Sequence, residues 1–511
     1  MTVHTPLPRD YNAAVDFIDR HVPEGRGSKR AFVDDEQALT YAELAERVAR
    51  AGSALLALGA HPEQRVAMCM LDSVDFPCVF WGAVKAGVVP VPLNTLLTTP
   101  DYAFMLRDCR AGVLVVSDAL FEKVAPAAAA SPYLRSVVRT SELASLLAAA
   151  SPHLDAAATC ADDVAFWLYS SGSTGTPKGA VHLHSNLAHT GSLYGDGVLG
   201  VREDDVVFSA AKLFFAYGLG NGMTFPLRAG ATAVLMAERP TAAAVMRTMK
   251  THEPTIFGGV PTLFASILAD ATLDRAAGSP RLRVSISAGE ALPRHVGERW
   301  RERFGSDILD GIGSTEMLHI FLSNRHGDVR YGTSGKPVPG YDVKLVDPSG
   351  EPVADGDEGA LWVRGPSACA GYWNQREKSL ATFHGPWTRT GDRYTRDADG
   401  YYTCAGRDDD MLKVGGIWVS PFEVESALGE HEAVLEAAVV GHADDEGLVK
   451  PRAFVVLKAP GDASDALAAE LKAFVKGRLA PYKYPRWIVF ATELPKTATG
   501  KIQRFKLRDG S

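Results

Sequence analysis

The residues best suited to chemistry form a glycine- and hydroxyl-rich segment, 169–179, that carries Lys178 near its end. Glycine lets backbone N–H groups approach phosphate oxygens closely, and hydroxyl groups add hydrogen-bond donors. The lysine ammonium group offsets the negative charge of a phosphate chain. The segment therefore predicts a phosphate-binding loop. Its candidate contacts are Ser170, Ser171, Gly172, Ser173, Thr174, Gly175 and Lys178.

Two other interpretations of this loop are less favoured by the sequence. A flexible linker has a similar composition, but residues 164–168 form an apolar strand candidate directly before the loop, which is unusual for a linker. A Walker-type loop of an ADP-forming phosphotransferase needs a glycine five residues after Gly172 and a Ser or Thr after Lys178. This chain has Pro177 and Gly179 there.

A parallel α/β fold is expected to position the loop. Thr40 and Glu43 form a capping-box pattern at the start of a helix that ends near Gly59, and strand candidates at 65–70 and 113–116 alternate with further helical stretches. This alternation, with strands apolar on both faces, predicts doubly wound, mostly parallel sheets covered by helices.

The pattern changes twice towards the C-terminus. Residues 331–402 have short alternating strands separated by turns, typical of a small barrel or meander. Beyond residue 410, a βαβ-like stretch is expected, with helices at 421–428 and 465–479 and a strand at 433–441.

Length and composition indicate a large globular protein. The 511 residues correspond to about three structural units, and we divide them into a large N-terminal domain, 1–409, and a small mobile C-terminal domain, 410–511. The 46% of hydrophobic and 22% of charged residues exclude a disordered or coiled-coil protein. A formal net charge of −8 lacks the basic surplus of a nucleic-acid binder.

A cytoplasmic location is predicted. The six cysteines lack the spacing of a disulfide framework or zinc site, so a reducing compartment is expected. The chain start has no signal-peptide pattern, and the longest apolar stretch, 79–93, is interrupted by Lys85, Gly87 and Pro90. No nucleic-acid or membrane partner is expected, and a homodimer is left open.

Beyond the loop, the whole chain resembles the adenylate-forming acyl-CoA synthetases, firefly luciferases and peptide-synthetase adenylation domains. Residues 310–316, Asp-Gly-Ile-Gly-Ser-Thr-Glu, are similar to the second nucleotide motif of this family. The resemblance implies that Thr315 contacts the α-phosphate of ATP and that Glu316 helps hold Mg²⁺, which typically takes one or two carboxylates together with substrate phosphates. Alone, Ser-Thr-Glu would be interpreted as a helix cap.

Three further segments, one before and two after residues 310–316, occur in the order typical of the family. Residues 287–292 resemble the segment along the adenine, 387–392 the segment whose aspartate holds the ribose, and 406–416 the inter-domain hinge. The resemblance assigns nucleotide and CoA contacts to Ala288, Gly289, Glu290, Asp310, Gly311, Ile312, Gly313, Ser314, Thr315, Asp392, Arg407, Gly415 and Gly416. It also implies rotation of the small domain about Asp409.

Residues 495–504 resemble the family's C-terminal catalytic loop. A movable ammonium group between a carboxylate and a polyphosphate lowers their repulsion during adenylation, and Lys501 is the candidate for this role. Lys496 is interpreted as a solvated lysine. The catalytic assignments are Lys501, Thr315, Glu316, Lys413 and Asp409.

Residues 212–221 match the segment that lines the acyl pocket in the family. Amino-acid-activating relatives have an aspartate where this chain has Ala216, and an unpartnered buried carboxylate would be costly. An uncharged, aromatic-lined pocket favours an apolar acid without an amine. The candidate substrate contacts are Phe215, Ala216, Tyr217, Gly311, Ile312, His319 and Ile320. His319 either contacts the substrate or is a hydrogen-bonded core histidine.

The resemblance is greatest to the benzoate-CoA ligase branch. It implies ATP-dependent ligation of an aryl acid, benzoate first, to coenzyme A through an acyl-adenylate, with release of pyrophosphate and AMP. Hydroxy- or amino-benzoates and medium-chain acids are the alternative substrates. Among CoA, a carrier-protein thiol and O₂, CoA is preferred because no carrier domain follows. A non-catalytic binder is disfavoured by Lys501 and Glu316.

Overall fold

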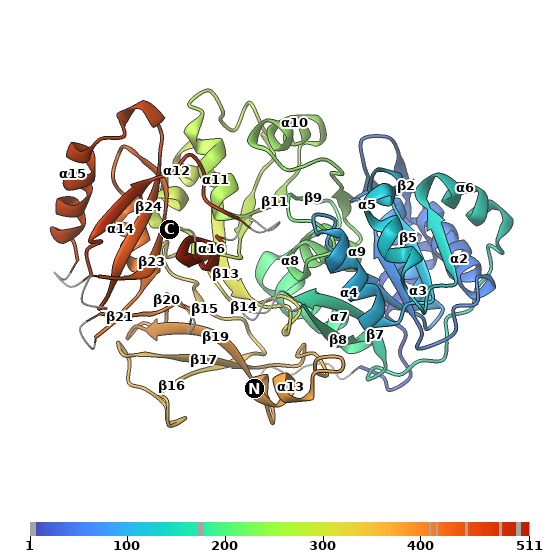
Figure 1. The fold of residues 1–511 in the computed structure, drawn as a ribbon. Coiled ribbons are helices and arrows are strands. Elements are labelled where there is room, and N and C mark those ends of the chain that lie inside the picture. Colours follow the sequence, from blue (N-terminus) through green and yellow to red (C-terminus); the bar gives the residue numbers. More distant parts are fainter. Residues whose placement is uncertain are drawn as a thin grey trace.

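The computed structural model describes residues 7–170, 177–407, 410–414, 417–444, 448–479, 483–496 and 502–509. The described chain forms two mostly parallel sheets, an antiparallel meander and a smaller C-terminal α/β unit (Figure 1). The C-terminal unit lies at one end of the molecule and the N-terminal sheet at the other. The predicted fold class is confirmed.

The N-terminal sheet has the strand order β4-β3-β5-β6, and every pairing in it is parallel. Its strands are β3 (Arg65–Cys69), β4 (Val89–Pro92), β5 (Val113–Val116) and β6 (Ser136–Arg139). The helices of this region are α2 (Tyr41–Ala57), α3 (Asp75–Lys85), α4 (Thr99–Cys109), α5 (Asp118–Ala129) and α6 (Thr140–Ala149). These bounds confirm the strand and helix predictions for this region.

Helix α2 begins as the sequence predicts. The Glu43 N–H donates to Thr40 Oγ1 at 3.3 Å, and the Thr40 N–H donates to Glu43 Oε2 at 2.8 Å. The helix packs so closely on α3 that a Cβ atom added at Gly82 would lie only 2.7 Å from the Cβ of Ala51. A glycine is needed for this close approach.

The second sheet has the order β15-β14-β13-β12-β11-β9-β10-β1-β2. Its interior pairings are parallel, and β2, β14 and β15 are antiparallel at the two edges. The strands are β1 (Arg30–Val33), β2 (Ala38–Thr40), β9 (Val206–Ser209), β10 (Thr232–Val234), β11 (Ile256–Gly259), β12 (Val284–Ser287), β13 (Asp307–Gly313), β14 (Ile320–Ser323) and β15 (Lys336–Pro337). Every residue of β11 and β12 is buried, as expected for central parallel strands.

Helices and tight turns surround this sheet. The helices are α1 (Ala13–Phe17), α7 (His184–Thr190), α8 (Ala216–Leu219), α9 (Phe225–Ala229), α10 (Ala242–His252), α11 (Pro261–Ala269) and α12 (Arg294–Phe304). Segments with 3₁₀ or π geometry occur at Asp19–His21, Val22–Arg26, Gly191–Leu199, Gly220–Thr224 and Pro460–Asp462.

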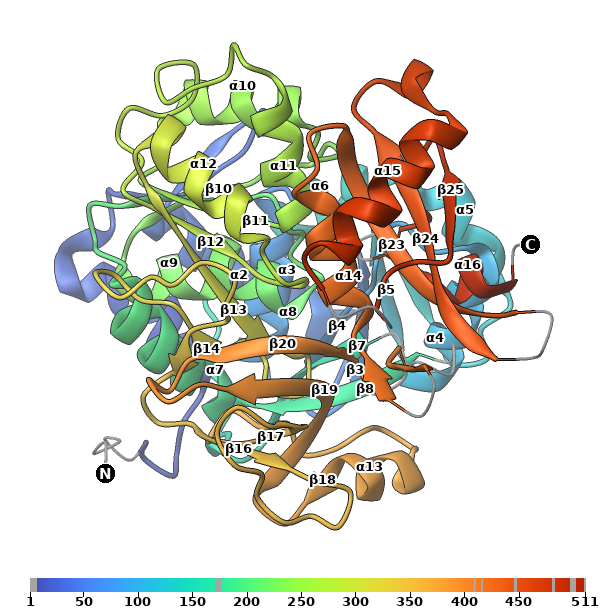
Figure 2. The same cartoon turned by 90° about the vertical axis from the view of Figure 1, so that its left-hand side faces the viewer.

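A hairpin and a meander complete the large unit. The hairpin pairs β7 (Val164–Ser170) with β8 (Lys178–Leu183). The antiparallel meander lies below the C-terminal unit in Figure 2. It contains β16 (Asp342–Val346), β17 (Glu358–Arg364), α13 (Arg376–Thr382), β18 (Phe383–His384), β19 (Trp387–Arg396) and β20 (Tyr402–Arg407).

The C-terminal unit has a hydrophobic core of its own, which includes Val424, Val439 and Leu471. Its elements are β21 (Leu412–Val414), β22 (Ile417–Val419), α14 (Pro421–Gly429), β23 (Val434–Ala443), β24 (Val449–Leu457), α15 (Asp465–Lys476), β25 (Trp487–Phe490) and α16 (Arg504–Asp509). The predicted helices and strand are thus confirmed. The boundary between residues 409 and 410 stays a prediction. Within the described ranges, no helix is both long and apolar enough to cross a bilayer.

Candidate active site

The predicted phosphate loop connects the two strands of the β7–β8 hairpin. Ser170 and Lys178 are paired in register at the loop end of this hairpin, so they flank the loop on both sides. The Ser170 hydroxyl is buried and has no hydrogen-bond partner among the described residues. The remaining predicted contacts, Ser171, Gly172, Ser173, Thr174 and Gly175, lie outside the described residues.

Lys178 meets Glu316 through a third residue, Tyr372. The Tyr372 hydroxyl donates to Glu316 Oε1 at 2.7 Å, and Lys178 Nζ donates to the same hydroxyl at 3.2 Å. Burial alone would raise the pKa of Glu316, but the Tyr372 hydrogen bond and the Lys178 charge hold that pKa below its usual value. Glu316 is therefore an ionised carboxylate beside an ammonium group.

This carboxylate suits a cation that is held jointly with a nucleotide. Magnesium typically binds one or two carboxylates and fills its other positions with phosphate oxygens and water. Among the described residues, no group of three or more His, Cys, Asp or Glu side chains could hold a metal without help. The Glu316 carboxylate and the Lys178 ammonium group suit a magnesium ion and a phosphate chain, respectively.

The turn that carries Glu316 is held by a buried histidine from β8. His182 Nε2 lies 2.9 Å from the carbonyl oxygen of Thr315, and its ring stacks on Phe166 at a centroid distance of 5.0 Å. Burial lowers the pKa of His182 to about 4, so the ring is neutral. On the other side of the turn, the Met317 N–H donates to Ser314 Oγ at 3.2 Å.

The predicted adenine contacts lie at the carboxyl ends of β12 and β13. These strands are parallel, with Ser287 in register with Asp310, so their ends meet at one edge of the sheet. Ala288, Gly289 and Glu290 follow β12, and Gly289 has a φ of 98°, which favours glycine. The predicted residues Gly311, Ile312 and Gly313 complete β13 at the same edge.

Two buried polar atoms at this edge lack partners. Ser287 Oγ and Asp310 Oδ1 have no hydrogen-bond partner among the described residues. Burial raises the pKa of Asp310 well above its usual range, which favours the uncharged acid. Unpartnered buried polar groups are rare in proteins and are commonly satisfied by a ligand or water. A polar group of a ligand could satisfy both atoms at this edge.

The predicted ribose aspartate, Asp392, lies on β19 next to Arg407 of β20. These residues are paired in register, and Arg407 Nη1 lies 3.0 Å from Asp392 Oδ1. The structure therefore brings together two predicted contacts that lie 15 residues apart in the sequence.

The predicted acyl-pocket residues surround the start of α8. The Tyr217 hydroxyl lies 3.0 Å from the carbonyl oxygen of Gly259 and 2.9 Å from that of Ile286, so its one proton is shared between them and ties α8 to β11 and β12. Ala216 precedes it in the same helix, and Phe215 packs on Phe214 at a centroid distance of 4.4 Å.

His319 lies inside an aromatic cage. Its ring centroid is 4.8 Å from Tyr194, 5.8 Å from Tyr217 and 4.6 Å from Phe225. Neither ring nitrogen has a hydrogen-bond partner among the described residues, and burial lowers the pKa of His319 to about 3. Ile320 follows it and pairs with Gly313 across the β13–β14 hairpin. His319 is thus a neutral ring that is buried among aromatic side chains.

The C-terminal predictions are only partly covered by the structure. Lys413 lies on β21, opposite Trp418 of β22. Lys501, Asp409, Gly415 and Gly416 lie outside the described residues. The residue after Lys501 is described, and its N–H, that of Ile502, donates to Glu290 Oε1 at 3.2 Å.

Sequence reasoning missed Tyr372, His182 and Tyr194. Each reaches the site through tertiary contacts, and none belongs to a recognisable local motif. The sequence signal near Tyr372 is the preceding glycine, Gly371. In the structure Gly371 has a φ of 142°, and its carbonyl oxygen accepts from the Val181 N–H of β8 at 3.0 Å.

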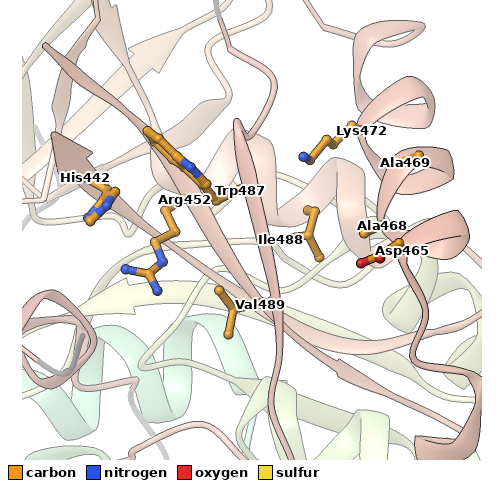
Figure 3. Close-up of a pocket in the computed structure, with 9 residues that line it drawn as sticks. All are labelled: His442, Arg452, Asp465, Ala468, Ala469, Lys472, Trp487, Ile488 and Val489. Atoms are coloured by element: carbon orange, nitrogen blue, oxygen red, sulfur yellow. The ribbon is translucent and has the colours of Figure 1, made fainter. Parts of the chain in front are cut away.

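A separate hollow lies on the C-terminal unit, between α15 and the strands β24 and β25 (Figure 3). It has a volume of about 420 Å³, and Arg452, Lys472 and Trp487 are among its lining residues. None of the predicted site residues lines it.

Comparisons with known proteins agree with this geometry. A family model described as "AMP-binding enzyme" matches residues 19–373, and one described as "AMP-binding enzyme C-terminal domain" matches residues 423–501. A benzoate–CoA ligase from Thauera aromatica is 60% identical over 98% of this chain and 96% of its own length.

Two solved structures are also similar. A benzoate CoA ligase from Burkholderia xenovorans has 56% identity and a TM-score of 0.92, over 98% of this chain and all (100%) of that one. An anthranilate CoA ligase in complex with anthranoyl-AMP has 44% identity and a TM-score of 0.95, over 99% of this chain and 98% of that one. With the family model covering most of the large unit and a second model the small one, the chain belongs to the AMP-binding enzyme family.

Proposed function

We propose that this protein is an ATP- and Mg²⁺-dependent aryl-CoA ligase, with benzoate as its first substrate. The observation that carries the proposal is one turn, between β13 and β14, that bears both an ionised carboxylate, Glu316, and a neutral caged histidine, His319. The first suits magnesium and phosphate, and the second suits a small aromatic acid. The relatives named benzoate–CoA ligase support this assignment.

ATP binding uses the residues at the sheet edge. Lys178 and the adjoining loop hold the phosphates, Thr315 the α-phosphate and Asp392 the ribose. Ser287 and Asp310 have unpartnered polar atoms where the adenine would lie. Glu316 holds Mg²⁺, which when bound neutralises charge on the phosphates during transfer. A relative with a bound acyl-AMP, the anthranilate CoA ligase, supports a nucleotide in this family.

The acid is held in the cage around His319. Ala216 offers no countercharge for an amino group, and burial raises the pKa of Asp310 well above its usual range, which favours its uncharged form. The substrate carboxylate can accept a hydrogen bond from the N–H of the neutral His319 ring. The aromatic rings of Tyr194 and Tyr217, packed on that histidine, favour a flat apolar body.

The reaction runs in two steps. The substrate carboxylate attacks the α-phosphorus and expels pyrophosphate, while the Lys501 ammonium group lowers the repulsion between the two anions. The C-terminal domain, 410–511, then rotates about Asp409 relative to 1–409, and the CoA thiol attacks the acyl carbon so that AMP leaves. Lys413, Gly415 and Gly416 line the path of the thiol in this second arrangement.

The alternatives differ in product or substrate. A phosphotransferase would form ADP, and a non-catalytic binder would form no product. A hydroxy- or amino-benzoate ligase would share the mechanism and differ only in the preferred acid. Soluble ATP, CoA and a small acid are the partners that the proposal requires.

Pyrophosphate release over a panel of aryl and alkyl acids tests the proposal. With CoA omitted, a single burst of pyrophosphate is expected for benzoate, because the adenylate stays bound. Addition of CoA should convert the burst to continuous turnover. No release with any aryl acid would contradict the proposed function.

A further inference from the structure

One residue in the nucleotide site has no assigned role. Tyr372 lies between Lys178 and Glu316, is only 7% exposed, and contacts both through one hydroxyl group. The hydroxyl donates its proton to Glu316 Oε1 at 2.7 Å and accepts from Lys178 Nζ at 3.2 Å. The ammonium group also lies over the tyrosine ring, 4.5 Å from its centroid.

The backbone around Tyr372 is held by the same two elements. Its neighbour Trp373 donates from its N–H to the carbonyl oxygen of Gly179 at 2.9 Å, directly after Lys178. On the other side, the Cys369 N–H donates to the carbonyl oxygen of Glu316 at 2.8 Å. Segment 369–373 is therefore attached to the backbone at both charged residues, which fixes where the phenol ring stands.

The phenol separates two charges that would otherwise attract each other. Among the described residues, no direct ion pair joins Lys178 to Glu316, and the tyrosine oxygen mediates between them. A direct pair would occupy the ammonium protons and the carboxylate oxygens that phosphate and metal need. The bridge engages one carboxylate oxygen and one of the three ammonium protons.

We propose that Tyr372 is a positioning residue for the magnesium–ATP complex. It keeps Lys178 and Glu316 apart, in the orientation in which the lysine meets phosphate and the carboxylate meets the metal. The inference rests on the proposed function only in taking ATP and Mg²⁺ as ligands of this site. It adds a residue outside the glycine loop and the 310–316 motif.

The test compares two forms of the same nucleotide by isothermal titration calorimetry, without acid or CoA. One titrant is ATP with excess Mg²⁺, and the other is ATP with EDTA. For Tyr372→Phe, binding of magnesium–ATP should weaken by about tenfold or more, as expected when a hydrogen bond to a charged group is lost. Binding of metal-free ATP should weaken less, because only the contact of Lys178 with phosphate is then disturbed.

A matched control removes a buried hydroxyl elsewhere. Tyr41 is fully buried and donates to the carbonyl oxygen of Ala231 at 2.7 Å, in the N-terminal region. Tyr41→Phe should bind both forms of ATP as the wild type does. Tyr372→Phe deletes one oxygen and keeps the ring that contacts Phe383, so the folded state should persist, and a thermal melt checks this.

A double-mutant cycle completes the test. Once Glu316 is replaced in Glu316→Gln, the further change Tyr372→Phe should cost much less magnesium–ATP affinity than it costs in the wild type. Equal weakening of magnesium–ATP and metal-free ATP, no weakening of either, or fully additive effects in the cycle would each overturn the proposal. Because no acid is present, those outcomes would leave aryl-CoA ligation to be judged by pyrophosphate release.

Discussion

The backbone N–H of Ile502 donates a hydrogen bond of 3.2 Å to Oε1 of Glu290. This bond joins the C-terminal unit to the carboxyl end of β12, where the predicted adenine contacts lie. The flanks of the C-terminal loop are also paired with each other, since Lys496 forms a β-bridge with Ile502 and its ammonium group lies 2.6 Å from Glu436 Oε2. The residue next to Lys501 is thus held against the nucleotide site.

Lys501→Ala should abolish formation of the acyl-adenylate and largely spare thioester formation from a supplied adenylate. The charge of Lys501 is needed only while the carboxylate approaches the polyphosphate, and loss of one such group typically costs ~10²-fold or more in rate. Single-turnover assays of each half-reaction measure the two rates separately.

Lys496→Ala is the matched control for this prediction. Lys496 stands in the same loop but is paired with Glu436, so its removal should leave both half-reactions close to wild-type rates. If Lys501→Ala slowed both half-reactions equally, the separation of roles would be wrong.

Asp409→Pro should leave adenylation nearly intact and cripple thioester formation. Proline fixes φ near about −65°, whereas a hinge residue must change its backbone angles between two arrangements. Asp409→Ala keeps this freedom and serves as the control. Pre-steady-state pyrophosphate release without thioester would support the hinge, and an unchanged overall rate for the proline variant would rule it out.

Local patterns were predictable from the sequence, and contacts between distant segments were not. The cap of α2 depends on Thr40 and Glu43, which are neighbours in the chain, and the structure confirms it. The Tyr372 bridge depends instead on the pairing of Ala180 with Tyr372, which only the folded chain creates. No residue spacing indicates this pairing.

The state of His319 was also beyond the sequence. A histidine on an apolar stretch is equally compatible with a hydrogen-bonded core residue and with a ligand-binding one. The structure gives its ring three aromatic neighbours and no hydrogen-bond partner among the described residues. For the acid itself, the resemblance to a known family supplied what residue chemistry alone did not.

Tyr217→Ala should weaken turnover of benzoate and improve that of larger aryl acids. The ring of Tyr217 packs against His319, and removing it enlarges the pocket, where each unfilled or misplaced methylene-sized volume is worth ~1–3 kcal/mol in discrimination. The readout is kcat/KM for benzoate and for a bulkier substituted benzoate.

Tyr217→Phe separates the ring from its hydroxyl group. This variant loses the hydrogen bond that Gly259 and Ile286 share, so it should be less stable by about 1 kcal/mol with its acid preference unchanged. If Tyr217→Ala and Tyr217→Phe altered acid preference alike, pocket size would not be the cause.

His184 should make the folded chain sensitive to mild acid. The Ala13 N–H donates to His184 Nδ1 at 3.1 Å, and burial lowers the pKa of this ring to about 4. The unfolded chain has the ordinary pKa of about 6.5, so it takes up the proton first as the pH falls. The contribution of His184 is therefore complete above pH ~6.5, decreases towards pH ~4 and changes no further below.

Urea unfolding over this pH range measures the effect. In His184→Gln, the pH dependence of the free energy of unfolding should be smaller than in the wild type by up to about 1.4 kcal/mol per pH unit. Parallel curves for the two proteins would contradict the assignment of a neutral, buried His184.

Ligation of an aryl acid to CoA through an adenylate can be read directly from its products. The measurement is mass-spectrometric analysis of the products formed from ATP, Mg²⁺ and CoA with benzoate, together with kcat/KM for benzoate and for octanoate. We expect benzoyl-CoA, AMP and pyrophosphate in equal amounts, and a kcat/KM for benzoate at least about tenfold above that for octanoate. Formation of ADP in place of AMP would rule out an adenylate, and a preference for octanoate or longer aliphatic acids would rule out an aryl acid as the preferred substrate.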